Sequence, residues 1–162
     1  MSDNTNDSIV ARISEELIHR LNMISTRAGY DFTPSAVDRV RVTPIVGPWP
    51  FVVLHDPVEE IVDGANDTDV STLTYCVSFL NICADGAQND ESASYQHRNV
   101  TSDITRAIVG TDRQFNGLIE SIKTTMRGSG IAEDVAGNRF YQAYVVFKIT
   151  VRIDSNDPRL LG

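Results

Sequence analysis

The residues of this chain whose types are suited to chemistry are few and scattered. The three histidines, His19, His55 and His97, show no His-x-x-x-His spacing, which would put two imidazoles on one helix face for zinc. They fall in a predicted helix, at the end of a predicted strand and in a predicted loop. We therefore predict no metal site from them.

Other short motifs are equally incomplete. Gly128-Ser129-Gly130 lacks the Gly-Lys-Ser/Thr ending of a phosphate-binding loop and the Gly-x-Ser-x-Gly pattern of a hydrolase. The run Asp154–Asp157 resembles the start of a calcium loop but lacks its glycine and its distal glutamate. Adjacent carboxylates such as Glu59-Glu60 are typical of solvated segments. The sequence thus predicts no catalytic, cofactor-binding or metal-binding residues.

The two cysteines, Cys76 and Cys83, are expected to be small buried side chains. On or beside one predicted strand, at this odd spacing, they point to opposite faces and are poorly placed to bond to each other. A chain kept in a cytosol also needs no disulfide.

Three side chains are better candidates for contact with another protein. Trp49 lies between two prolines, which make its turn stiff, and it can be either a core plug or an anchor for a partner. Arg39 and Arg41 alternate with valines on a predicted strand, Val37–Thr43, so both lie on its outer face. Arginine is enriched at interfaces, so a subunit contact is an alternative to simple exposure.

The clearest element is a strand from Arg139 to Asp154. Its even positions are mostly polar or amphipathic, and a period of two places the odd and even positions on opposite faces. The odd face needs a helix or a second sheet over it, so we expect this strand inside the main sheet. The odd positions are all apolar: Tyr141, Ala143, Val145, Phe147, Ile149, Val151 and Ile153.

Two helices are predicted. Ser8–Ala28 carries apolar residues every three or four positions, with Asp7 or Ser8 as its cap and Gly29 as a left-handed end. Its charged residues, Arg20 among them, are placed on the other sides of the helix. The second helix starts at Thr101, which can cap it, and ends at Gly110; it is short and must dock on the rest of the protein. Its shared apolar face comprises Val100, Ile104, Ala107 and Ile108.

Further strands are predicted at Phe51–Leu54 and Thr72–Ile82. The segment Val58–Val62 extends the first or turns away from it. Two polar loops are predicted at Asp63–Ser71 and Ala84–Asn99, and loops as long as the second are usually functional or mobile.

The segment Arg113–Arg127 fits both a helix and a strand. Its paired threonines and Gly117 favour the strand, with Ile122, Thr124 and Met126 on one face. In that case Ile119–Met126 and the long C-terminal strand form a wide hairpin. Gly128-Ser129-Gly130 and Ala136-Gly137-Asn138 would flank the loop between them.

Length and charge set broader limits. A chain of 162 residues predicts one domain, here residues 8–158, with a disordered N-terminus at 1–7 and a C-terminal tail at 159–162. A net charge of −8 disfavours a surface that neutralises nucleic-acid phosphates. No apolar run approaches the roughly 20 residues that span a bilayer, and the acidic N-terminus does not read as a signal peptide. We expect a soluble cytosolic protein without a membrane partner.

The order of these elements is informative as a whole. After the N-terminal helix, a Pro-rich segment leads to W-P-F-V-V-L-H-D-P-V-E-E-I, and a later short helix carries D-I-T-R-A-I. Q-F-N-G-L-I-E-S-I-K follows, and the last strand runs out as V-V-F-K-I-T-V-R-I-D-S-N-D-P. Over roughly Ile9 to Pro158, this layout resembles the tail-terminator, or tail-completion, proteins of long-tailed bacteriophages, also called minor tail proteins. The Asp103–Ile108 helix and the strand ending in Asp157-Pro158 contribute most.

The resemblance implies an α+β fold: one mixed, largely antiparallel sheet with the N-terminal helix and the second helix packed on it. It implies a virion structural protein, without enzymatic activity or cofactor, that forms a homohexameric ring. Such a ring caps the completed tail tube, stops its polymerisation and presents a surface for head–tail joining. The implied partners are the tail tube protein and a head-completion or connector protein, while DNA passes through without specific binding. The implied location is the head-proximal end of the virion tail, reached from the host cytoplasm during assembly.

Two alternatives stay open. Within the same structural class, the chain can be another head–tail connector or a tail tube subunit. From a different class, it can be a small ligand-binding or enzymatic α/β domain with His55, Asp56 and His97 around its pocket. That second alternative requires the three side chains to converge in space.

Overall fold

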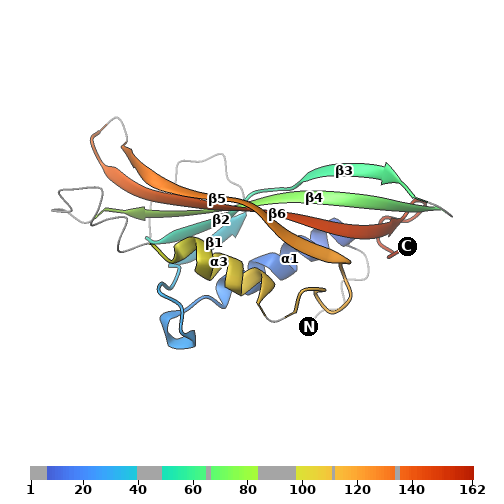
Figure 1. Cartoon of the computed structure of the whole chain (residues 1–162), viewed down its shortest axis with the longest axis horizontal. Helices are drawn as coiled ribbons and strands as arrows, with labels where there is room; N and C mark the ends of the chain where they lie inside the picture. Colours follow the sequence, from blue (N-terminus) through green and yellow to red (C-terminus); the bar gives the residue numbers. More distant parts are fainter. Residues whose placement is uncertain (1–6, 40–48, 65–66, 84–97, 111, 134–135) are drawn as a thin grey trace.

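The fold is described from a computed structural model, which covers residues 7–39, 49–64, 67–83, 98–110, 112–133 and 136–162 (Figure 1). Within these residues, one six-stranded sheet carries two α-helices, α1 (Ile9–Asn22) and α3 (Val100–Val109), on one of its faces. This confirms the predicted α+β class with a mixed, largely antiparallel sheet. None of the described helices is long and apolar enough to cross a membrane.

The strand order places two strands at opposite edges of the sheet. The central path is β1-β2-β4-β6-β5, and β3 pairs with β4 beside this path. Because β2 pairs with the second half of β4 and β3 with its first half, β2 and β3 share one side of β4, and β6 lies on the other. The strands are β1 (Ala36–Arg39), β2 (Phe51–Leu54), β3 (Val58–Asp63), β4 (Thr68–Ile82), β5 (Ser121–Glu133) and β6 (Arg139–Asp154).

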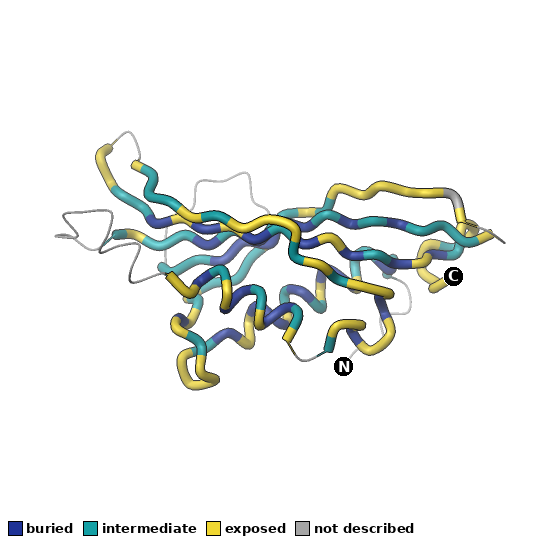
Figure 2. Tube along the Cα trace, viewed as in Figure 1, coloured by how far each residue is buried: buried dark blue, intermediate teal, exposed yellow. Residues whose placement is uncertain are grey.

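The strand β6 has the predicted bounds and the predicted place inside the sheet, between β4 and β5. Every odd position from Tyr141 to Ile153 is buried, in one core with the apolar residues of the helices. Figure 2 colours the buried positions of the strand dark blue. The matching face of β4 is also buried and contributes Leu73, Tyr75, Val77 and Phe79. The core therefore lies between the helix layer and the odd face of these two long strands.

The helix α1 is shorter than predicted. Ser8 caps its start as expected, since the Ser8 side chain accepts a hydrogen bond from the Ala11 N–H at 3.2 Å. The helix ends at Asn22, because Ser25 takes an extended conformation and its hydroxyl caps a separate 3₁₀ turn, η1 (Thr26–Ala28). Gly29 is left-handed with φ +80°, as predicted, but it closes that turn rather than α1.

The helix α3 confirms the predicted apolar face and the end at Gly110, with one correction at its start. It begins at Val100, and Asn99 occupies the cap position without a side-chain hydrogen bond to the helix. Thr101 is therefore inside the first turn and not the cap. Its carbonyl accepts a hydrogen bond from the Thr105 hydroxyl at 2.7 Å.

Three predicted segments differ from the structure or extend beyond the described residues. The predicted loop Asp63–Ser71 is mostly strand, because β4 starts at Thr68 and pairs there with both β3 and β6. Those two ladders satisfy the backbone of the polar residues at this end. Of the predicted strand Val37–Thr43, the structure describes the part in β1, and residues 40–43 lie outside the described residues. Most of the predicted loop Ala84–Asn99 also lies outside them.

The ambiguous segment Arg113–Arg127 resolves into a turn followed by a strand. Phe115, Asn116 and Gly117 have φ of 50°, 56° and 85°, a left-handed run that no helix contains. Three apolar side chains of this segment are buried, which accounts for its helix-like spacing: Phe115, Leu118 and Ile119. The strand β5 then pairs with β6 in the predicted wide hairpin, but it continues through Gly128-Ser129-Gly130, which was expected beside a loop.

A bulge changes which side chains share a face of β5. The register with β6 shifts between Thr124 and Met126. As a result, Met126 pairs with Val146 on the same face as Lys123, and not with Ile122 and Thr124 as predicted.

One buried charge joins the helix layer to the start of β5. Arg20, expected on an exposed side of α1, is 8 % exposed. Its guanidinium donates to the carbonyls of Ile108 and Asp112 at 2.8 and 2.7 Å and lies 4.0 Å from the centroid of the Phe115 ring. Its Nε also pairs with Glu16 at 2.7 Å. The sequence prediction missed the burial of Arg20, because helical spacing identifies a buried face from its apolar residues and not from arginines.

Candidate interaction surface

The two predicted interface residues that the structure describes, Trp49 and Arg39, do not lie in one patch. Trp49 is half-buried, with its ring 5.4 Å from the ring of Phe140, and its carbonyl accepts a hydrogen bond from Ser35. Arg39 ends β1 and pairs with Asp56 at 2.8 Å. In the parallel β1–β2 pair, Trp49 precedes one end and Arg39 lies at the other. Arg41 lies outside the described residues, and an interface role for the three stays a prediction.

The alternative pocket residues are only partly placed. His55 and Asp56 follow β2, and His97 lies outside the described residues. The imidazole Nε2 of His55 lies 2.8 Å from the Ser78 hydroxyl, across the face of the sheet that carries no helix. Asp56 is instead paired with Arg39. The structure therefore places His55 next to a serine, but it does not place Asp56 with it.

The His55–Ser78 hydrogen bond joins a base to a hydroxyl, the first half of an activated nucleophile. The neighbouring Cys76 is a poor nucleophile, because burial raises the pKa of its thiol and keeps it protonated. Among the residues that the structure describes, no three His, Cys, Asp or Glu side chains are grouped to hold a metal ion.

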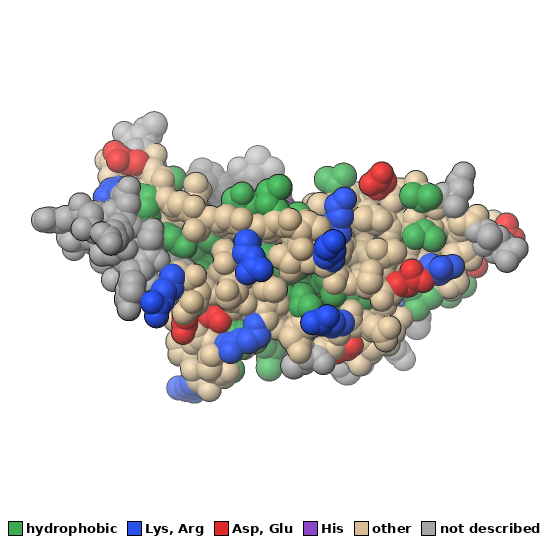
Figure 3. Space-filling model, viewed as in Figure 1, with side chains coloured by type: hydrophobic (Ala, Val, Ile, Leu, Met, Phe, Trp, Pro, Cys, Tyr) green, Lys and Arg blue, Asp and Glu red, His purple; other side chains and the backbone are tan. Residues whose placement is uncertain are grey.

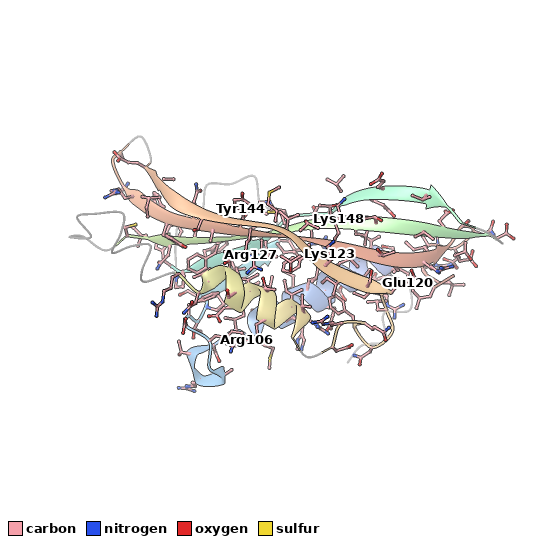
Figure 4. The ribbon with its side chains drawn as sticks, in the orientation of Figure 1. Arg106, Glu120, Lys123, Arg127, Tyr144 and Lys148 are labelled. Atoms are coloured by element: carbon pink, nitrogen blue, oxygen red, sulfur yellow. The ribbon has the colours of Figure 1, made fainter. Side chains whose placement is uncertain are left out.

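The β5 edge of the sheet is basic. β5 pairs only with β6 in the described part of the chain, and most of its residues are exposed. Figure 3 shows Lys and Arg side chains gathered over this part of the surface, and Figure 4 places Lys123, Arg127 and Lys148 there. We call these three residues the basic edge. Glu120, at the start of this strand, is already paired with Arg152.

The basic edge contains an unfavourable pair. Lys123 and Lys148 are direct partners in the β5–β6 register and share the face without helices. Like charges opposite each other destabilise a sheet. No ion pair within the described part of the chain neutralises Lys123, Lys148 or Arg127. An anionic partner on this edge would relieve that repulsion.

The β3 edge is acidic and apolar. β3 pairs with β4 alone among the described strands, and it carries Glu59 and Glu60. Val58, Ile61 and Val62 on the same strand are 71 %, 60 % and 57 % exposed, so three large apolar side chains stand in water (Figure 2). We call these five residues the acidic edge. Grouped exposed apolar side chains are typical of surfaces that bind another protein.

Sequence reasoning missed both edges, although each left a signal. The run V-E-E-I-V-D reads as solvated carboxylates, yet its apolar residues have no covering partner in a strand that ends a sheet. The alternating pattern puts Lys123 and Met126 on opposite faces of the strand, because such a pattern does not reveal a bulge. Only the register shows that Lys123 faces Lys148.

No protein-family model matches the chain, and no curated protein matches it in sequence. The resemblance to tail terminators therefore stands on the layout of elements alone. The surface described above has to support any functional conclusion.

Proposed function

We propose that this chain is a virion assembly protein of the tail-terminator kind, which acts as a ring-forming subunit on the end of a tail tube. The single observation that carries the proposal is a pair of sheet edges without a further strand partner among the described residues, the basic edge at β5 and the acidic edge at β3, on opposite sides of one sheet. Both are surfaces suited to contact with protein, and neither is used within the described fold.

Two different surfaces on opposite sides of a subunit favour a head-to-tail arrangement. Contacts between unlike surfaces either close into a ring by rotation or continue as an open filament. A terminator requires the closed form, because it must stop growth and leave a passage. The overall negative charge suits a passage that DNA traverses without being held.

The first test is native mass spectrometry of the purified protein across a concentration series, combined with co-sedimentation on purified tail tubes. The expected result is a closed oligomer, a hexamer by the resemblance, or a fixed number of copies bound per tube end. A protein that neither assembles nor binds tail tubes would contradict the proposal. Growth of the protein into long tubes would instead favour a tail tube subunit.

A second candidate rests on the hydrogen bond between His55 and Ser78, which favours a small ligand-binding or enzymatic domain. The test is a screen with acyl and phosphoryl ester substrates, comparing the wild type with His55→Ala and Ser78→Ala. Turnover that both variants abolish would support this candidate. Turnover that neither variant changes would remove it.

A further inference from the structure

On each face of the sheet, the two edges carry charges of opposite sign. On the face without helices, Lys123 lies on β5 and Glu60 on β3, each on the outermost strand of its side. On the helix face, the register places Arg127 on β5, opposite Val145, and Glu59 on β3, opposite Leu73. Each of the two outermost strands therefore carries charge of its edge's sign on both faces of the sheet.

We infer that the basic edge of one copy docks against the acidic edge of a second copy of this chain. The inference rests on the proposed function and names the contact that builds the ring. Complementary charges steer such an encounter and fix its orientation. The same contact places an anionic neighbour beside the Lys123–Lys148 pair, whose repulsion no ion pair among the described residues relieves.

The outermost strands β3 and β5 also both expose apolar side chains. Val58, Ile61 and Val62 on β3 would be covered by the side chains of β5, where Met126 is 57 % exposed. Burying these side chains supplies the favourable part of the association, since ion pairs at an exposed rim contribute little.

Each edge is also protected against a copy of itself. Lysine and a bulge on an outermost strand are the usual devices that prevent two equal edges from pairing, and β5 has both. Two acidic edges repel in the same way. Only the unlike pair is attractive, which selects the head-to-tail contact over a symmetric dimer.

The test uses charge reversal on the full chain. One variant carries Lys123→Glu and Arg127→Glu, and the other carries Glu59→Lys and Glu60→Lys. Each alone should weaken self-association about a hundredfold, because like charges across a contact cost several kcal/mol and 1.4 kcal/mol is tenfold. An equimolar mixture should restore self-association, since every contact between one variant and the other again joins unlike charges.

A matched control is Arg12→Glu with Arg27→Glu, which makes the same charge change at exposed positions of the helix layer. It should assemble like the wild type. Because the Glu59 carboxylate accepts a hydrogen bond from Ser71, Glu59→Lys can disturb the fold. The smaller pair, Lys123→Glu and Glu60→Lys, leaves that bond intact. Circular dichroism and thermal unfolding confirm that each variant is folded.

The readout is the oligomer distribution by sedimentation at several salt concentrations, free and on purified tail tubes. Weakening with added salt is expected, because salt screens exposed charges. If the wild type assembles and neither variant changes it, this inference is wrong while the proposed function stands. If the wild type stays monomeric both free and on tubes, both fail. If Lys123→Glu with Arg127→Glu abolishes binding to a short DNA duplex and leaves self-association unchanged, the basic edge binds nucleic acid and the inference is wrong.

Discussion

At the scale of single residues, Arg20 has a structural role that the sequence did not reveal. It satisfies the Ile108 carbonyl near the end of α3 and the Asp112 carbonyl in the turn that leads to β5. A cation at a helix C-terminus also interacts favourably with the helix dipole. Arg20 thus connects three segments that are far apart in the chain.

We predict that Arg20→Ala lowers the free energy of unfolding by about 2–3 kcal/mol, because hydrogen bonds to a charged group are lost and two carbonyls are left without a donor. Arg20→Lys should recover only part of this, since an ammonium cannot make the same forked contacts. Urea denaturation measures both. Arg12→Ala, at an exposed position of the same helix, should change the value by less than about 0.5 kcal/mol.

A second residue-scale prediction concerns alkaline pH. The Tyr75 hydroxyl is buried, 2.9 Å from the Ser14 hydroxyl, and burial raises its pKa from 10.0 to about 12. Above pH 10 the unfolded chain loses this proton while the folded chain keeps it. Stability is therefore fully present below pH 10 and falls as the pH rises toward about 12.

The measurement is urea unfolding at pH 8, 10 and 11.5 for the wild type and Tyr75→Phe. The variant should be less stable at pH 8 by about 1 kcal/mol, because it loses a hydrogen bond. Its stability should then decline less steeply between pH 10 and 11.5. Parallel declines for the two proteins would show that Tyr75 is not responsible.

At the scale of elements, the sequence predicts strands well where one face is fully buried. The odd residues of β6 all lie against the core, so a pure alternation was enough to give its bounds. Sequence-based prediction fails where a segment becomes a strand through pairing with distant strands and has no alternating pattern of its own. Thr68 is strand because it pairs with β6, Asp69 is strand because β3 and β6 flank it, and Met126 changes face because of the bulge after Thr124. Neither effect is local in the sequence.

An element-scale prediction concerns Gly64, which directly follows β3. A Cβ added at Gly64 would lie 1.7 Å from the backbone oxygen of Thr68, so the backbone at these two residues must move apart. Gly64→Ala should cost about 1–3 kcal/mol, as overpacking does, and should loosen β3 first. Amide hydrogen exchange should show faster exchange in β3 than in β6.

The matched control is Gly130→Ala, where an added Cβ meets no atom within 4 Å. It should leave both stability and exchange close to the wild type. If Gly64→Ala behaves like this control, the close approach of Gly64 to Thr68 does not hold β3 in place, and this prediction is wrong.

At the scale of the whole molecule, the fold class followed from the sequence, but the candidate surface did not. Buried faces follow from the spacing of residues such as Tyr141 and Ile149. The two edges follow from which strands end the sheet, and that depends on β3 pairing beside β2 on one side of β4. A long-range pairing of this kind leaves no periodic trace. This is why Trp49, Arg39 and Arg41 were chosen from local features, while Lys123 and Glu60 were not.

The hydrogen bond between the Ile9 N–H and the Pro158 carbonyl, at 3.0 Å, brings the first helical residue next to the end of the chain. Leu161 also pairs back with Ile153 at the end of β6. The first helical residue and the last residues of the chain therefore lie side by side. In a ring whose axis follows the strands, they would lie on the same rim in every copy. A peptide or reporter fused after Gly162 would then be displayed on that rim only, with the opposite rim left unobstructed.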